Sequence, residues 1–213
     1  MEKVTLTIDD KEIITDKESN ILTAALENGI YIPHLCYYSG LEPPGICRLC
    51  VVDVSGDIVF SCRSTVKEGM VVKTRSPVVD KIREVNFEII MANNHMSCKG
   101  CAATGFCEVQ KIMAFCKTDK KRVRRLRPPE KQFPIDESNP CFDYDANKCV
   151  LCEVCIGTCN KIQKALNLVG RGWKTKVEFH GDTSICEKCG DCVARCPVGA
   201  LVPKGKAQLQ KSA

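Results

Sequence analysis

Residues 149–159 read CVLCEVCIGTC, and residues 186–197 read CEKCGDCVARCP. Both runs have the spacing C-x2-C-x2-C-x3-C, with which bacterial iron–sulfur proteins bind two [4Fe-4S] clusters: three close thiolates hold one cluster and the fourth reaches the other. The second run repeats the first, which indicates an internal duplication. We therefore expect two cluster sites with exchanged fourth ligands: Cys149, Cys152, Cys155 and Cys196 in one, and Cys186, Cys189, Cys192 and Cys159 in the other.

The composition supports metal ligands rather than disulfides. The chain has 17 Cys among 213 residues, and its N-terminus, MEKVTLTIDDKEI, alternates apolar with charged residues and lacks the apolar core of an export signal. We expect a cytoplasmic protein without a membrane span, in which disulfides do not persist. Structural zinc sites are the alternative, but two complete runs of four Cys favour iron–sulfur clusters.

A separate cysteine group, called the first group below, lies in the N-terminal third. Apolar residues alternate over 3–8 and 11–15, Ser19 or Asn20 can cap a helix that begins at Ile21, and short strands follow at 50–54, 57–60 and 70–74. This order predicts a β-grasp domain. Its thiols have the order of a [2Fe-2S] site, whereas a zinc ribbon would prefer two C-x2-C pairs. The expected ligands are Cys36, Cys47, Cys50 and Cys62.

A third group, Cys98-x2-Cys101-x5-Cys107, has only three thiols. A [4Fe-4S] cluster needs a fourth ligand, and we prefer His95 over Cys116, because Cys116 also fits the apolar stripe of a following helix with Val109, Ile112 and Met113. Before this group, Ser76-Pro77 predicts the start of a helix with a stripe at Val78, Ile82, Val85 and Ile89. Cys116 and Cys141 are then the two thiols without a cluster.

Residues 117–140 include KKRVRRLRPPEKQFP and show little periodicity, so they predict a surface linker. Its basic residues are either solvated or dock on an acidic partner subunit. The formal charge of +5 falls to about −2 once the clusters are counted, so we expect no nucleic-acid binding. A zinc-stabilised interaction or nucleic-acid-binding module is the rival interpretation.

Six stretches carry a resemblance to a known family: IPHLC (32–36), CRLCVVDV (47–54), SCRSTVKEGMVV (61–72), CKGCAATGFCEVQ (98–110), FPIDESNPCFDYDANKCVLCEVCIGTCN (133–160) and CGDCVARCPVGAL (189–201). In these stretches the chain resembles the N-terminal iron–sulfur module of complex I G-type subunits and of [FeFe]-hydrogenases, and most closely the diaphorase-side iron–sulfur subunit of NAD-reducing hydrogenases. The family's cubane with one His and three Cys ligands commonly has the pattern H-x3-C, and here Asn94 stands at that position.

The resemblance implies an electron-transfer subunit between a flavin- and NAD(P)-binding subunit and a second catalytic subunit, such as a hydrogenase or an electron-bifurcating oxidoreductase. No G-x-G-x-x-G or Walker A run is present, and few residues follow the last cysteine, so we expect no catalysis by this chain alone. The expected fold is α+β: a β-grasp [2Fe-2S] ferredoxin-like domain (1–76), a small helical [4Fe-4S] domain with one His and three Cys ligands (77–116), a basic linker (117–140) and a bacterial-type 2[4Fe-4S] ferredoxin domain (141–213). The expected cofactors are one [2Fe-2S] and three [4Fe-4S] clusters.

Overall fold

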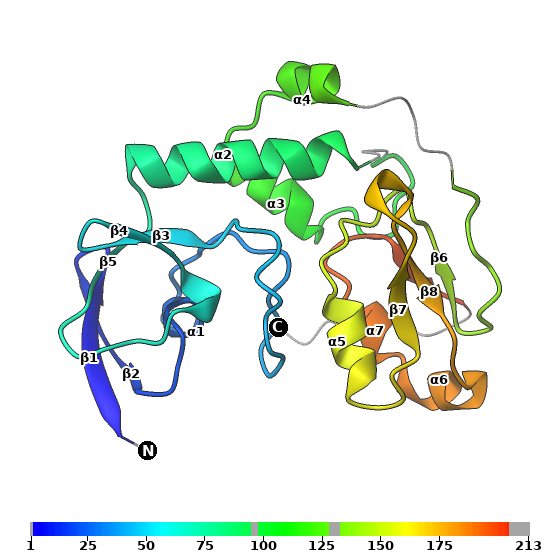
Figure 1. The fold of residues 1–213 in the computed structure, drawn as a ribbon, viewed down its shortest axis with the longest axis horizontal. Coiled ribbons are helices and arrows are strands. Elements are labelled where there is room, and N and C mark those ends of the chain that lie inside the picture. The colour runs from blue at the N-terminus through cyan, green and yellow to red at the C-terminus, as the bar shows by residue number, and fades with distance from the viewer. Residues whose placement is uncertain (1, 95–97, 128–132, 205–213) are drawn as a thin grey trace.

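The computed structural model describes residues 2–94, 98–127 and 133–204, and it begins with a five-stranded mixed sheet (Figure 1). The strand order is β2-β1-β5-β3-β4, in which β1 pairs parallel with β5 and the other pairs are antiparallel. The buried residues of α1 (Ile21–Glu27) share one apolar core with this sheet. The strands are β1 (Lys3–Ile8), β2 (Lys11–Asp16), β3 (Val51–Val54), β4 (Asp57–Phe60) and β5 (Val71–Lys73).

Local chemistry explains the first elements. Asp9 and Asp10 join β1 to β2 with φ of 47° and 65°, the left-handed pair that a two-residue hairpin needs and that Asp tolerates. Asn20 rather than Ser19 caps α1, because its Oδ1 accepts the backbone N–H of Thr23 at 2.8 Å. The predicted hairpin, helix and returning strands are therefore confirmed.

The long helix α2 (Pro77–Ala92) begins as predicted, with the N–H of Val79 donating to Ser76 Oγ at 3.2 Å. The expected apolar stripe is wrong, since Val78 and Ile89 are each 55% exposed. The buried stripe follows a neighbouring face at four-residue spacing and contains a charged residue, which concealed it in the sequence. Its members are Val79, Arg83, Phe87 and Met91.

Two shorter helices pack near α2 (Figure 1). α3 (Glu108–Phe115) buries Val109 and Ile112, as the sequence predicts. The structure corrects the expectation of a linker without regular structure, because α4 (Lys120–Leu126) forms within residues 117–140. Asp119 caps α4 by accepting the N–H of Lys121 at 2.8 Å, Val123 is buried, and Arg122 forms an ion pair at 2.9 Å with the buried Glu88 of α2. Tertiary contacts with α2 therefore stabilise a segment whose own periodicity is weak.

The remaining elements form a second lobe (Figure 1). Two antiparallel strand pairs, three short helices and the 3-10 turn η2 (Gly172–Lys174) surround the last two cysteine runs. The 3-10 turn η1 (Ser61–Arg63) belongs to the N-terminal part, between β4 and β5. The elements are β6 (Phe142–Tyr144) paired with β9 (Leu201–Pro203), β7 (Leu166–Val169) paired with β8 (Lys176–Phe179), and α5 (Val154–Asn160), α6 (Thr183–Cys189) and α7 (Asp191–Ala194).

One continuous apolar core connects the helices with this second lobe. It contains Phe87 of α2 and Ile112 of α3 together with Val154 and Leu201, and it also includes Leu49 from the loop that carries the first cysteine group. The first cysteine group thus lies where the sheet, the helices and the second lobe meet. Among the described residues, no helix has the length and apolar character needed to cross a membrane.

Candidate metal centres

The first group brings its four thiols together as two hydrogen-bonded pairs, all buried. Cys36 donates to Cys47 Sγ at 3.3 Å, which lowers the pKa of Cys47 to about 7 and raises that of Cys36. In the second pair, the hydrogen bond from Cys62 lowers the pKa of Cys50 to about 7, and the pKa of Cys62 is raised by the same bond. One thiol of each pair is thus prepared to ionise, as a metal ligand must.

Left-handed residues between the cysteines shape the binding loops. Arg48, Leu151 and Glu153 have φ of 53°, 52° and 62°, which is uncommon for residues with a Cβ. Alternation of left- and right-handed residues turns backbone N–H groups into a concave nest for an anionic group. The N–H of Leu151 accordingly donates to Cys149 Sγ at 3.4 Å. Such strained backbone persists where function requires it, and here it surrounds two predicted sites.

The second group joins Cys149, Cys152 and Cys155 to Cys196 of the other run. Burial raises the pKa of Cys155 well above its usual value, and the thiols of Cys152, Cys149 and Cys196 raise it further. Burial also raises the pKa of Cys149, and a hydrogen bond from the Tyr144 hydroxyl to this thiol partly offsets the rise. Four thiolates in one buried place would repel each other, so ionising all four together would need a compensating positive charge, which a metal centre could supply.

The last group joins Cys186, Cys189 and Cys192 to Cys159, beside a cavity of about 490 Å³ that all four line. Burial raises the pKa of Cys192 to about 12, and Cys159, Cys186 and Cys189 contribute to this rise. Polar side chains also face the group, since Gln163 Nε2 donates to Cys186 Sγ at 3.3 Å. Cys141 lines the same cavity and raises the pKa of Cys186, so this thiol lies beside the group although the sequence gives it no ligand role.

The third group holds Cys98, Cys101 and Cys107 near one another. Burial raises the pKa of Cys107, the N–H groups of Gln110 and Val109 lower it, and Cys101 and Cys98 raise it. Cys116 lies in different surroundings. Burial has the largest effect on its pKa and raises it, Arg83 and Arg75 lower it, and Asp80 and Glu84 raise it. The other candidate ligand, His95, lies outside the described residues.

The groups are close enough to affect one another. Cys36 of the first group raises the pKa of Cys152 in the second, and Cys192 of the last group raises that of Cys155. The third group is also adjacent, because the N–H of Glu108 donates to the carbonyl of Pro197 at 3.0 Å, one residue beyond Cys196. The group of Cys149 is therefore adjacent to each of the other three.

The described residues contain no set of three or more His, Cys, Asp or Glu side chains arranged to hold a single metal ion. Residues that sequence reasoning missed include Tyr144 and Gln163, whose polar atoms form hydrogen bonds with the thiols of Cys149 and Cys186. Neither belongs to a cysteine run, and both reach their thiols through tertiary packing, so no local sequence signal marks them.

Comparison with known proteins agrees with this chemistry. Residues 1–77 match the family described as a 2Fe-2S iron-sulfur cluster binding domain. The whole chain matches a chain in the crystal structure of NAD+-reducing [NiFe]-hydrogenase in the H2-reduced state with a TM-score of 0.82 and 32% identity, covering 95% of this chain and 88% of that one. The fold and this match define the class: an α+β iron–sulfur protein with a [2Fe-2S] ferredoxin-like domain.

Curated relatives narrow the class. The chain is 36% identical over 209 residues to NADPH-Fe(3+) oxidoreductase subunit alpha of Geobacter sulfurreducens, covering 94% of this chain and 24% of the relative. It is 34% identical over 218 residues to NADP-reducing hydrogenase subunit HndD of Solidesulfovibrio fructosivorans, covering 95% of this chain and 36% of the relative. This chain thus spans about a quarter to a third of the length of these curated relatives.

A third relative, the mitochondrial NADH-ubiquinone oxidoreductase 78 kDa subunit of Neurospora crassa, is 32% identical over 209 residues, which cover 95% of this chain and 28% of the relative. The chain belongs to the family of iron–sulfur subunits of NAD(P)-linked oxidoreductases and hydrogenases, which includes the complex I G-type subunits and the iron–sulfur subunit of NAD-reducing hydrogenases.

Proposed function

We propose that this chain is a cytoplasmic electron-transfer subunit with one [2Fe-2S] and three [4Fe-4S] clusters, placed between a flavin- and NAD(P)-binding subunit and a second catalytic subunit. Bound clusters would supply one-electron transfer. The observation that carries the proposal is the grouping of the Cys thiols, in which Cys196 lies near the thiols of the first run and Cys159 lies near those of the second.

The donor sets fit the proposed clusters. In the first group, the pairing of Cys36 with Cys47 and of Cys50 with Cys62 supports a [2Fe-2S] site in which each pair holds one iron. In the second and last groups, four thiols each match the four corners of a cubane. For the third group we propose His95 as the fourth ligand, supported by the position of Cys116 among Arg83, Arg75 and Asp80 rather than among the three thiols.

The protein's own groups would bind the clusters, orient the thiols and limit the access of water. Backbone N–H groups such as that of Leu151 donate to the sulfurs, and the hydroxyl of Tyr144 orients Cys149. Cys152 and Cys36 are both buried in one apolar core, which limits their contact with water. The central position of the Cys149 group supports its role as the point where electrons from the other sites meet.

The isolated chain, purified without oxygen, should contain about 14 iron atoms, the content of one [2Fe-2S] and three [4Fe-4S] clusters, with equal sulfide. It should not oxidise NADH or NADPH with an artificial dye, whereas a complex with its flavin subunit should. Stoichiometric zinc with little iron would instead support the zinc-stabilised module, and turnover by the chain alone would refute the role of a pure electron carrier.

A further inference from the structure

A fully buried arginine contacts the loop of the first cysteine group from outside the matched [2Fe-2S] domain. Arg83 is 1% exposed and lies on α2, beyond the end of the match at residue 77. A buried guanidinium is costly unless its donors are paired, so its partners indicate what it does.

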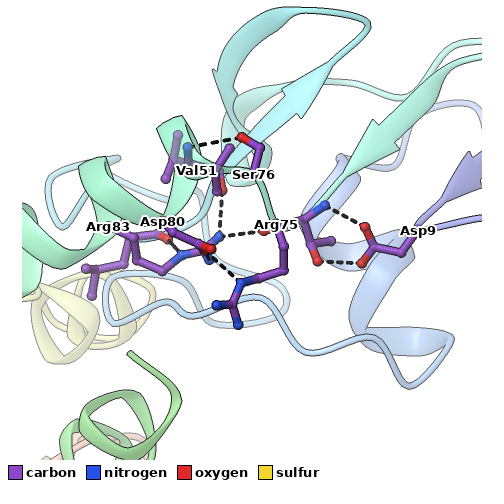
Figure 2. A network of polar contacts seen from close by, with 9 residues as sticks. Asp9, Val51, Arg75, Ser76, Asp80 and Arg83 are labelled. Carbon is purple, nitrogen blue, oxygen red and sulfur yellow. Dashed lines mark hydrogen bonds and ion pairs between the residues drawn. The ribbon is translucent and has the colours of Figure 1, made fainter. Parts of the chain in front are cut away.

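The partners of Arg83 are backbone carbonyls on both sides of a predicted ligand. Arg83 Nε donates to the carbonyl of Leu49 at 3.1 Å, and Nη2 donates to that of Val51 at 2.8 Å. Leu49 and Val51 flank Cys50, which is 2% exposed. A third bond joins Nη2 to the carbonyl of Thr74 at 3.1 Å, next to the end of β5. Figure 2 shows the side chain of Arg83 extending from α2 to this backbone.

The charge of Arg83 is only partly balanced. Asp80 Oδ1 lies 3.4 Å from Arg83 Nη1, but the same oxygen lies 2.7 Å from Nε of Arg75 (Figure 2). Asp80 is also 39% exposed, so water screens its charge. Two guanidinium groups thus share one carboxylate, and a net positive charge remains beside the loop. The guanidinium of Arg83 also lies 5.5 Å from the ring centre of Phe115, which closes its other side.

We propose that Arg83 is a positioning residue for the [2Fe-2S] site: it fixes the backbone around Cys50, and its buried positive charge raises the reduction potential of that site. The inference rests on the [2Fe-2S] site proposed above. Reduction adds one negative charge to the cluster and its thiolates, and a nearby positive charge at low dielectric stabilises the reduced form. A residue outside the [2Fe-2S] domain thereby controls how readily that domain accepts an electron.

The test is an EPR-monitored redox titration of the full chain with its clusters. Arg83→Met should lower the midpoint potential of the [2Fe-2S] signal, and Arg83→Lys, which keeps the charge but loses the paired bonds, should lie between Arg83→Met and the wild type. Lys81→Met is the matched control, because Lys81 lies on the same helix but its side chain is 60% exposed and pairs with Glu84. It should leave the potential unchanged.

A purely structural role predicts loss of stability or of iron without a change of potential in the molecules that keep the cluster. If the Arg83→Met variant does not assemble its [2Fe-2S] cluster, the Asp80→Asn variant provides the test. Removing this partly exposed carboxylate should raise the midpoint potential of the [2Fe-2S] signal, by less than Arg83→Met would lower it. An unchanged or lowered potential in Asp80→Asn, or an unchanged one in Arg83→Met, overturns the inference. Absence of any [2Fe-2S] signal in the wild type refutes the proposed site itself, which keeps the two failures distinct.

Discussion

Gly199 offers a test of how closely the third cysteine group packs on the second lobe. A Cβ at this position would lie 2.5 Å from Cys101 Sγ and 3.3 Å from Ala103 Cβ. Ordinary contacts begin near 3.4 Å, so in Gly199→Ala the Cys101 sulfur must move by about 1 Å. Metal–ligand distances tolerate only about 0.2 Å, and overpacking of this kind costs roughly 1–3 kcal/mol.

Gly199→Ala should therefore disturb the cluster proposed at Cys98, Cys101 and Cys107 and lower the apparent unfolding temperature. We expect a loss of up to about 4 irons per chain, the content of one cubane, with a change in one EPR signal. The same substitution at Gly157 is the control: its Cβ would lie 3.6 Å from Leu41 Cδ1, an ordinary contact, and the residue is inside α5. Gly157→Ala should keep all clusters and gain up to about 1 kcal/mol of helix stability.

The test compares Gly199→Ala with Gly157→Ala and the wild type by iron content, EPR spectra and thermal unfolding. If Gly199→Ala retained every signal and unfolded at the same temperature as the wild type, the close contact between Gly199 and Cys101 would be wrong.

The remaining predictions concern the identity of the ligands and one buried ion pair. Cys196→Ser should disturb the same EPR signal as Cys149→Ser and leave the signal that depends on Cys186 largely intact; the opposite pairing would show that each run ligates its own cluster. His95→Ala should lose the third cluster or leave a three-iron form, His95→Cys should retain it at lower potential because a thiolate is more negative than an imidazole, and Cys116→Ser should do neither. If Cys116→Ser alone lost that cluster, Cys116 and not His95 would be the fourth ligand. Arg122→Ala should destabilise the fold by about 1 kcal/mol in chemical denaturation, because Glu88 would be left buried and unpaired, whereas the exposed Lys121→Ala should have little effect.

The cysteine groups could be predicted because ligand spacing is a local property of the chain. The duplication predicts that Cys196 accompanies the Cys149 run, and the structure places these thiols together. The hairpin and α1 were also predictable, since alternation and an Asn cap are local signals. The fourth ligand of the third group was not decidable in this way, because both candidates lie near the run in sequence.

The missed features depend on tertiary contacts. α4 has one buried apolar residue, Val123, and it is held by a pair between Arg122 and Glu88 that no window of the sequence contains. Arg83 did leave a signal, because it stands at four-residue spacing between Val79 and Phe87, where a charge in a buried stripe requires a partner. The stripe expected on α2 contained only apolar residues and left Arg83 out, so it fell on a neighbouring, more exposed face of the helix.

The exchange of thiols between the two runs has a consequence for biogenesis. The Cys149 group gathers around a thiol from the second run, Cys196, so it cannot be complete when its own run leaves the ribosome. The Cys186 group differs, because its distant thiol, Cys159, belongs to the earlier run and has already been made. On the proposed ligand assignment, Cys149, Cys152 and Cys155 form an incomplete set of ligands until the later run has been translated, and thiols without their metal are open to oxidation. Cluster insertion at the Cys149 group should therefore follow synthesis of the whole lobe, with the delivery machinery acting only after Cys196 has emerged.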